Sequence, residues 1–446
     1  MNGRTALAAA LLCSGLLASC GGGGGGGDGG GSGADCSLAA QQTWLHTEMH
    51  DHYYFNTLIQ DPPATQVFDS IDRYFGALLV SADHWSYVQD SVSYNRFFGA
   101  GQTFGYGLAV AGQSTDPLPL RVRDVAPGSA ADWAGVRRGM VVDSINGTDG
   151  ATLKSTNQLS ASLSATTAGE HITVQIRDSL NSPVSRQISL NATIYDLAPV
   201  GTPLIVTSVG GRKVAYLLYR TFIDSGMSAL QSSLTQFANA GVQDLVLDLR
   251  YNGGGLVRIA RDLASAIGGD GVYGQTFATL RYNAAHQASN TRFAFTPGLS
   301  KLNLPRVYVL TGVRTCSASE LVINGLKPFV QVIQIGATTC GKPYGFNPVE
   351  HCGNTFSALN FESVNALGAG GYTSGISPTC AASDDVEHAL GDPAEALTAA
   401  ALQHIDTGSC PATANSAATS VQALQSGRRS GRLIQDGEPL PGMMDR

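Results

Sequence analysis

The chain has 446 residues, of which 43% are hydrophobic and 14% are charged. This content of apolar residues is enough for sizeable hydrophobic cores and excludes a chain that is disordered throughout. Lys and Arg number 27 against 34 Asp and Glu, which gives a net charge of −7. Because there is no basic surplus to neutralise phosphates, the composition argues against a nucleic-acid partner.

The first 20 residues indicate the compartment. Arg4 precedes an apolar run at residues 6–17, which is shorter than the roughly 20 residues that span a membrane. The run ends in Leu17-Ala18-Ser19-Cys20, which resembles the lipobox of bacterial lipoproteins and implies that Cys20 is lipidated; the alternative is an ordinary signal peptide. Both readings predict export. Gly21 after the cysteine implies, by the same resemblance, an outer-membrane anchor facing the periplasm of the cell envelope.

A glycine-rich tether follows the signal peptide (1–20) and occupies residues 21–36. Residues 21–27 are all glycine, and Gly and Ser continue the run. Such a segment has few side chains to bury and behaves as a coil with a span of roughly 20 Å. A phosphate-binding loop is excluded, because no strand precedes the glycines and no Lys-Ser/Thr pair follows them.

Residues 37–100 are expected to form a small helical N-terminal domain. Apolar residues such as Leu45 and Met49 recur at helical spacing. Within this segment, the spacing of His46 and His50 resembles that of a metal-binding motif, but Glu48 lies one place too late for His-Glu-x-x-His. We therefore interpret them as exposed polar residues and expect no metal.

Residues 101–195 have a β-rich pattern. An alternating run at 118–125 is followed by Pro-Gly-Ser-Ala-Ala at 127–131, an apolar strand at 139–145 and an Asn-Gly turn at 146–147. This segment resembles a PDZ domain, and the resemblance places the carboxylate-binding loop at Phe104, Gly105, Tyr106, Gly107 and Leu108. Glycines there would expose backbone N–H groups to a peptide carboxylate beside a free strand edge; the alternative is that they only form a turn.

Residues 196–410 are the largest unit. Apolar strand-like runs at 213–222, 242–250, 306–312 and 330–338 alternate with helical patterns at 226–240 and 256–267. This alternation predicts βαβ units with right-handed crossovers, hence a parallel sheet. Residues 411–446 are polar and small, and we expect them to be disordered.

Six cysteines remain after the presumed lipid anchor: Cys36, Cys316, Cys340, Cys352, Cys380 and Cys410. An even number in an exported chain predicts disulfides, and five of the six would staple the C-terminal region. The absence of a C-x-x-C pair argues against a zinc ribbon or a thioredoxin-like site. The pairing stays open.

Two segments carry candidate chemistry. Residues 247–255 read Leu-Asp-Leu-Arg-Tyr-Asn-Gly-Gly-Gly, a strand that ends in glycines before a helix, where backbone N–H groups can hold an oxyanion. Residues 315–320 read Thr-Cys-Ser-Ala-Ser-Glu and place Ser317 between a strand and a helix, which suits a nucleophile. The alternative is a helix N-cap, with Glu320 completing a capping box.

The order of these motifs, followed by Gly341-Lys342, resembles the C-terminal processing peptidases, the S41 serine peptidases. The resemblance implies a multidomain α/β protein with a ClpP/crotonase-like core, a β-rich PDZ domain and a small helical N-terminal domain. It also implies that Ser317 is the nucleophile and Lys342 its general base. The N–H groups of Ala318 and of Gly254 or Gly255 are the candidate oxyanion donors. A lysine can serve as a base only when neutral, which requires burial, since its ordinary pKa is about 10.4.

One position departs from the family pattern. Many members carry a Gln four residues after the Lys, where this chain has Phe346. Cys316 and Cys340 beside the two catalytic candidates are also unusual, and we hypothesise that disulfides rigidify their segments.

The sequence thus predicts an exported, lipid-anchored Ser-Lys endopeptidase that needs no cofactor and whose PDZ domain captures polypeptide substrates by their C-termini. The first alternative is a catalytically inactive, peptide-binding lipoprotein scaffold, which Phe346 favours. A second is a crotonase-like enzyme acting on acyl thioesters. A Ser-His-Asp triad using His351 or His404 lacks the Gly-x-Ser-x-Gly elbow around Ser317.

Overall fold

The computed structural model describes residues 35–111, 119–412, 433–434 and 442–444. The lipobox with Cys20 and the glycine run of the tether lie outside these residues. Within the described part of the chain, no helix is both long and apolar enough to cross a membrane.

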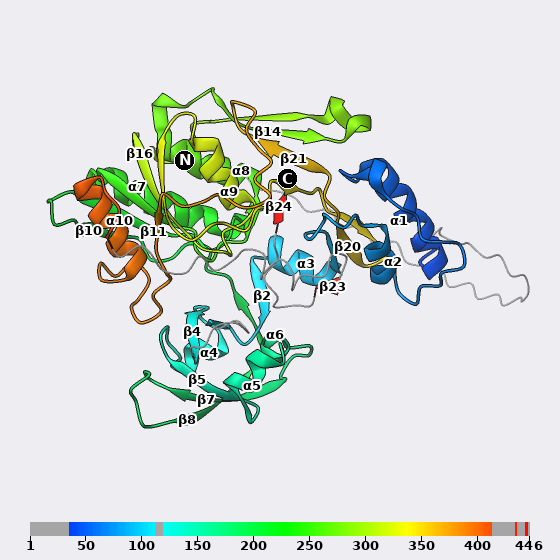
Figure 1. Cartoon of the computed structure of the whole chain (residues 1–446), viewed down its shortest axis with the longest axis horizontal. Helices are drawn as coiled ribbons and strands as arrows, with labels where there is room; N and C mark the ends of the chain where they lie inside the picture. Colours follow the sequence, from blue (N-terminus) through cyan, green and yellow to red (C-terminus); the bar gives the residue numbers. More distant parts are fainter. Residues whose placement is uncertain (1–34, 112–118, 413–432, 435–441, 445–446) are drawn as a thin grey trace, which may run out of the picture. The chain divides into compact units, whose positions relative to one another are not determined.

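A six-stranded sheet forms the centre of residues 200–410 (Figure 1). Its first two strands are antiparallel and all others run parallel, as the alternation of strands and helices predicts. In spatial order the strands are β10 (Leu204–Thr207), β11 (Lys213–Leu218), β12 (Asp244–Asp248), β16 (Arg306–Thr311), β17 (Gln331–Gly336) and β22 (Cys380–Ala381).

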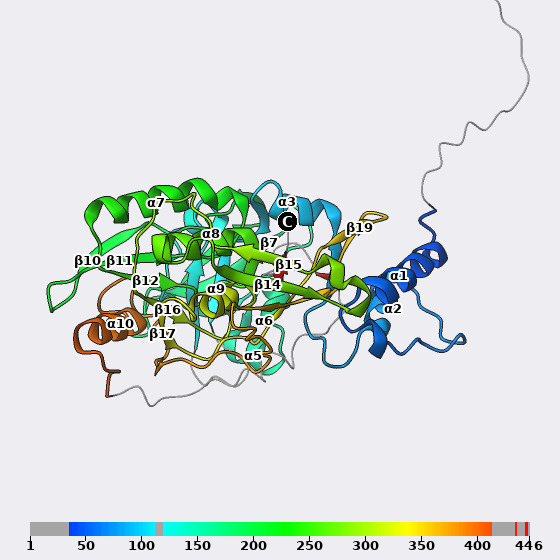
Figure 2. The same cartoon turned by 90° about the horizontal axis from the view of Figure 1, so that it is seen from above.

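Helices cover both faces of this sheet. α7 (Met227–Ala240), α8 (Val257–Gly268) and α9 (Ala318–Leu326) share one apolar cluster with the Leu217 face of β11. α10 (Ala396–Thr407) shares a second cluster with the Tyr216 face. Because neighbouring strand residues point to opposite faces, the strands bury side chains on both sides, which explains their continuous apolar runs. Figure 2 shows α7 and α10 on opposite sides of these strands.

The N-terminal segment is mostly helical but also contributes a strand. β1 (Tyr87–Asp90) pairs antiparallel with β20 (Asn354–Ser357), far along the chain. Its helices bury residues such as Leu45 and Phe75 in the same cluster as α7, α8 and α9, and a disulfide joins Cys36 to Cys352. Residues 37–98 therefore have no separate core. The helices are α1 (Leu38–His52), α2 (Ile71–Leu78) and α3 (Ser91–Phe98), with a 3₁₀ turn η1 (Asn56–Leu58).

Two smaller sheets lie beside the central one. The first has the order β15 (Thr291–Ala294), β14 (Thr276–Tyr282), β21 (Phe361–Val364) and β18 (Tyr344–Gly345). The second has the order β19 (Val349–His351), β20, β1 and β23 (Leu433–Ile434). Three further 3₁₀ turns are η2 (Asp224–Gly226), η3 (Gly269–Gly271) and η4 (Ala284–Ser289).

The β-rich segment from 102 to 196 has a hydrophobic core of its own, with Val122, Ile145 and Val174 at its centre. Its main sheet has the order β3 (Leu108–Ala111), β4 (Leu120–Val125), β5 (Val141–Ile145), β7 (His171–Arg177) and β8 (Arg186–Asn191), so β3 lies at an edge. β6 (Thr148–Asp149) pairs with β5, and β2 (Gln102–Gly105) with β9 (Thr193–Asp196). The helices are α4 (Ala130–Trp133), α5 (Gly150–Ser155) and α6 (Leu159–Leu163).

Two short strands late in the sequence differ from the expectation of disorder. β23 pairs with β1, and β24 (Gly442–Met444) pairs in parallel with β13 (Gly254–Leu256). The other residues between 413 and 446 lie outside the described part of the chain. Neither strand is long enough to show the alternating apolar pattern by which a strand is recognised in a sequence. Each forms by pairing its backbone with the edge of another strand.

Candidate active site

Ser317 occupies a sharp turn between β16 and α9. Its backbone has φ +62° and ψ −115°, a conformation that is strained for a residue with a Cβ. The side chain is fully buried, and Oγ has no hydrogen-bond partner among the described residues. Ser317 is the N-cap of α9, and it and Glu320 are placed as in a capping box, although Oγ makes no full hydrogen bond. The positive φ also fits a strained strand–turn–helix elbow of the kind that presents a nucleophile.

Glu320 ties the segment of Ser317 to the segment of Lys342. Its Oε2 accepts the backbone N–H of Ser317 and that of Lys342, both at 2.8 Å. Its Oε1 accepts the N–H of Gly341 at 2.8 Å and the hydroxyl of Thr339. Burial raises the pKa of Glu320, and these hydrogen bonds act in the opposite direction. One buried carboxylate thus fixes both catalytic candidates, a role that the capping-box interpretation missed.

A disulfide joins the same two segments. Cys316 directly precedes Ser317, and it is bonded to Cys340, two residues before Lys342. The backbone N–H of Cys340 also donates to the carbonyl of Thr315 at 3.0 Å. Both unusual cysteines are therefore in a disulfide, as the sequence led us to hypothesise, and the structure adds that they pair with each other and so join the nucleophile and base segments.

Removing this bridge is expected to reduce activity as well as stability. In the Cys316→Ala/Cys340→Ala variant, the free energy of unfolding should fall by about 3 kcal/mol, and kcat by up to about 100-fold, because small misplacements of reacting groups are costly. The matched control is Cys380→Ala/Cys410→Ala, whose bridge closes a loop of similar sequence separation, 30 residues against 24. Urea unfolding and kcat measurements should show a similar stability loss but no loss of kcat in the control. Equal kcat losses in both variants would contradict a specific role.

Lys342 is fully buried and faces an aromatic ring. Its Nζ lies 4.3 Å from the centroid of the Phe346 ring, which is itself buried and packs edge-on against Tyr87. The position where the family pattern has Gln thus presents a ring face to the amine. Burial removes hydration from an ammonium, whereas a ring face attracts it. The Ser317 hydroxyl and the Lys342 amine are not hydrogen-bonded to one another.

The turn after β12 supplies a candidate oxyanion donor. The Gly254 N–H donates to Oδ1 of Asn252 at 2.8 Å and is therefore engaged. Gly255 lies where a Cβ would come within 2.3 Å of the Phe222 carbonyl oxygen, so only glycine fits. Of the two glycines proposed from sequence, Gly255 is the better candidate, together with Ala318 at the start of α9.

Asn252 connects this turn to the nucleophile. Its carbonyl oxygen accepts the N–H of Cys316 and the hydroxyl of Ser319, each at 3.0 Å. Its side-chain amide donates to the Tyr219 carbonyl at 2.9 Å. The structure therefore brings together the three sequence motifs that were read separately along the chain.

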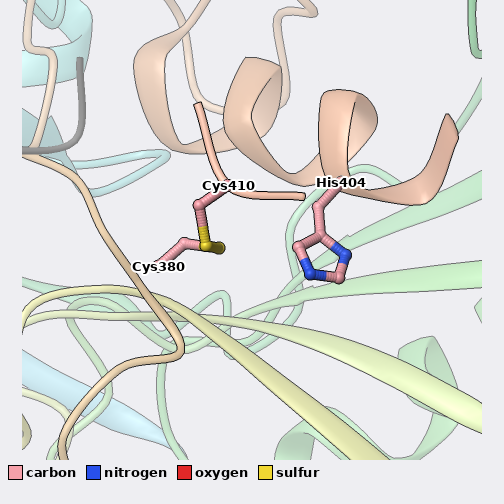
Figure 3. A group of neighbouring side chains, drawn as sticks. All are labelled: Cys380, His404 and Cys410. Carbon is pink, nitrogen blue, oxygen red and sulfur yellow. A yellow bond between two sulfur atoms is a disulfide. The ribbon is translucent and has the colours of Figure 1, made fainter. Parts of the chain in front are cut away.

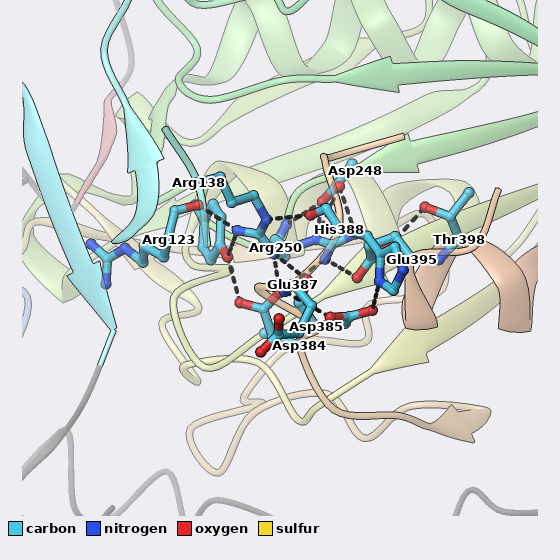
Figure 4. A network of polar contacts seen from close by, with 12 residues as sticks. Arg123, Arg138, Asp248, Arg250, Asp384, Asp385, Glu387, His388, Glu395 and Thr398 are labelled. Atoms are coloured by element: carbon cyan, nitrogen blue, oxygen red, sulfur yellow. Dashed lines mark hydrogen bonds and ion pairs between the residues drawn. The ribbon is translucent and has the colours of Figure 1, made fainter. Parts of the chain in front are cut away.

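Arg250 anchors the end of β12 in a buried polar network (Figure 4). Its guanidinium bonds Asp248 at 3.0 Å, Glu395 at 2.6 and 2.9 Å, and Asp384 at 3.0 Å. Arg138 of the β-rich segment also donates to Asp384, at 2.8 Å. The network therefore links the strand that leads to Asn252 with the β-rich segment.

Acid is expected to destabilise the protein through this network. Burial alone would raise the pKa of Glu395 and of Asp384, but the Arg250 guanidinium holds both pKa values below their usual range. Groups with a lowered pKa contribute stability that is present above their unfolded values near pH 4 and is lost as the pH falls through the folded values. In Glu395→Gln, the slope of unfolding free energy against pH below about pH 4 should fall by up to about 1.4 kcal/mol per pH unit. An unchanged slope in urea titrations would contradict this.

The peptide-binding candidates lie together in the β-rich segment. Phe104 and Gly105 end β2, Tyr106 and Gly107 form the connection, and Leu108 begins the edge strand β3. Gly107 has φ +73°, and a Cβ there would come within 2.0 Å of the Ser129 hydroxyl. The glycine is thus required by the close approach of this turn to Ser129.

Several side-chain groups have the composition of metal sites. Cys380, Cys410 and His404 form one group, but Figure 3 shows that the two sulfurs are bonded to each other, and a disulfide cannot supply the thiolate that binds metal. His46 and His50 direct Nε2 to Asp61 at 3.2 and 2.8 Å, whereas Glu48 lies 4.0 Å from His52. Glu48 is therefore on a different side of α1 from the His46–His50 pair, as its spacing predicts.

Part of the chain is similar to known proteins. Residues 213–376 match the model of peptidase family S41. Carboxyl-terminal-processing peptidase 3 of Arabidopsis thaliana chloroplasts is 28% identical over 230 residues, 50% of this chain and 42% of that protein. The carboxyl-terminal-processing protease of Synechocystis is 26% identical over 244 residues, 54% of this chain and 53% of that protein. The chain spans about half the length of the curated relatives it matches.

Solved structures show the same fold. A putative S41 protease from Bacteroides fragilis superposes with a TM-score of 0.67 at 24% identity, covering 82% of this chain and 97% of that one. The photosystem II D1 C-terminal processing protease gives a TM-score of 0.50 at 20% identity, with 77% and 92% covered. The expected multidomain α/β fold class is confirmed. The core of this chain, residues 213–376, is thus similar to peptidase family S41.

Proposed function

We propose that this protein is a serine endopeptidase in which Ser317 is the nucleophile and Lys342 the general base. The observation that carries the proposal is the Glu320 carboxylate, which accepts the backbone N–H groups of both residues at 2.8 Å. A carboxylate in this position holds two sequence-distant segments in one fixed arrangement. The strained backbone of Ser317 and its unpartnered hydroxyl among the described residues support the same assignment.

The chemistry is acyl transfer through two steps. The Ser317 oxygen forms a bond to the carbonyl carbon of the substrate while neutral Lys342 takes the hydroxyl proton. The carbon–nitrogen bond then breaks, and the proton passes to the leaving amine. Water hydrolyses the resulting ester and restores the hydroxyl. The N–H groups of Ala318 and Gly255 stabilise the negative oxygen of each tetrahedral intermediate.

Substrate capture is assigned to the β-rich segment as a PDZ domain. β3 lies at the edge of its sheet, directly after the turn at Tyr106 and Gly107. An edge strand beside such a turn suits a peptide that adds as a further strand and ends in a carboxylate. We extend the proposal to a lipid anchor at Cys20 in the cell envelope, on the sequence pattern alone.

Cleavage of an unfolded protein tests the proposal. The purified chain should degrade reduced casein, and Ser317→Ala should abolish this, because it removes the atom that forms the acyl bond. The control Ser232→Ala removes a hydroxyl on the surface of α7, bonded only within its own helix at 2.9 Å from the Ser228 carbonyl oxygen, and should leave the rate unchanged. A Ser317→Ala protein that is as active as wild type would overturn the assignment of the nucleophile.

The second candidate is a peptide-binding scaffold with an inactive core. Phe346 in place of Gln, and the absence of a hydrogen bond between the Ser317 hydroxyl and the Lys342 amine, favour it. Casein that stays intact in the presence of the wild-type chain, together with measurable binding of peptides, would select this candidate.

A further inference from the structure

The late strand β24 is a segment of this chain that lies at its own candidate active site. Residues Gly442–Met444 pair in parallel with Gly254–Leu256, the strand that carries a proposed oxyanion donor. Neighbouring contacts place β24 against α9, which begins directly after Ser317, and against β18, which lies two residues after Lys342. β24 therefore lies between the segments that carry the nucleophile and the base.

The backbone edge that β24 uses is the one a substrate would need. In a strand, the N–H and C=O groups of successive residues point to opposite edges. The Gly254 carbonyl and the Leu256 N–H both bond Phe222, at 2.9 and 2.8 Å. The Gly255 groups consequently face the other edge, where β24 pairs. The segment thus occupies the edge to which a peptide would bind beside the oxyanion donor.

The side chain of Met444 fills an enclosed site. It is 0% exposed, and the Tyr94 hydroxyl donates to its sulfur at 3.2 Å. Met444 also forms a backbone bridge with Phe346, whose ring faces the Lys342 amine. An unbranched apolar side chain with a polarisable sulfur suits such a site, because it can follow an irregular aromatic wall.

We propose that Gly442–Met444 occupies the substrate groove of its own chain, and that the site around Met444 is a subsite for an unbranched apolar side chain of a peptide substrate. This rests on the proposed function for the identity of the groove. Displacement of β24 is then a condition for substrate to reach Ser317, which is itself 0% exposed. The segment acts as a tethered competitor at an effective concentration of about 1 mM.

Substitution of Met444 in the full chain tests the competition. Met444→Asp puts a charge into the enclosed site and expels the segment, whereas Met444→Leu keeps an apolar side chain there. If the free segment binds with a Kd of about 0.1 mM, the tethered segment raises KM about tenfold. Met444→Asp should therefore lower KM for a fluorogenic peptide about tenfold with kcat unchanged, and Met444→Leu should stay close to wild type. Circular dichroism checks that both variants fold.

A binding measurement separates this inference from the proposed activity. The peptide Pro-Gly-Met-Met-Asp-Arg, which has the sequence of residues 441–446, is labelled and titrated by fluorescence anisotropy against the Ser317→Ala/Met444→Asp chain, which cannot cleave it. Binding is expected, and the same peptide with Asp in place of its second Met should bind at least tenfold more weakly. If the chain cleaves casein but Met444→Asp has the wild-type KM and the peptide does not bind, the inference is overturned and the peptidase stands. If the peptide binds and casein stays intact, the result supports the assignment of the groove and contradicts the proposed peptidase activity.

Discussion

Replacing Lys342 by Met is expected to lower kcat for peptide-bond cleavage by about 100- to 10,000-fold, the usual contribution of a positioned general base. Methionine has a similar length and no charge, so it fills the buried space beside Phe346 while removing the only group proposed to accept the Ser317 proton. Single-turnover cleavage of a fluorogenic peptide, with urea unfolding as a check on the fold, measures the effect.

Two comparisons make this result specific to proton transfer. Lys342→Arg keeps a cation over the ring but cannot lose its proton, so it should be as inactive as Lys342→Met. Phe346→Leu removes the ring face 4.3 Å from Nζ but keeps the amine, so it should retain kcat that Lys342→Met loses. An active Lys342→Met protein would show that another group accepts the proton.

The sequence predicted the central sheet because its strands are buried on both faces. Short, continuous apolar runs such as the one around Val246 and Leu247 indicate buried strands when helices of 12 to 14 residues alternate with them. Ser317 and Lys342 were named because three short, ordered motifs resemble a peptidase family, whereas the residues around Ser317 taken alone fitted a helix N-cap. The structure places Ser317 between β16 and α9, and Lys342 between β17 and β18.

Features that depend on long-range pairing could not be predicted in this way. The shared N-terminal core requires β1 to meet β20, and the disulfide requires Cys36 to meet Cys352, both across more than 250 residues of sequence. Glu320 was visible as a capping residue, but its bonds to Gly341 and Lys342 appear only once the two segments are folded together. The sequence of β24 has no alternating apolar pattern that would predict a strand. The segment becomes a strand by pairing with Gly254–Leu256, which lie far away in the sequence.

Replacing Arg250 by Met is expected to cost about 3–5 kcal/mol of unfolding free energy, which is typical of removing one partner from a buried ion network. The change leaves Asp248 and Glu395, both 0% exposed, without the guanidinium that compensates their charge. The control Arg73→Met removes an ion pair with Asp69 in which both side chains are more than two-thirds exposed, and should change stability by less than about 1 kcal/mol. Urea unfolding measures the free energy of both variants. Equal losses of unfolding free energy would contradict a central role for the network. Because Arg250 also fixes the strand end that leads to Asn252, and Asn252 holds the Ser317 segment, the residual folded Arg250→Met protein should also lose kcat.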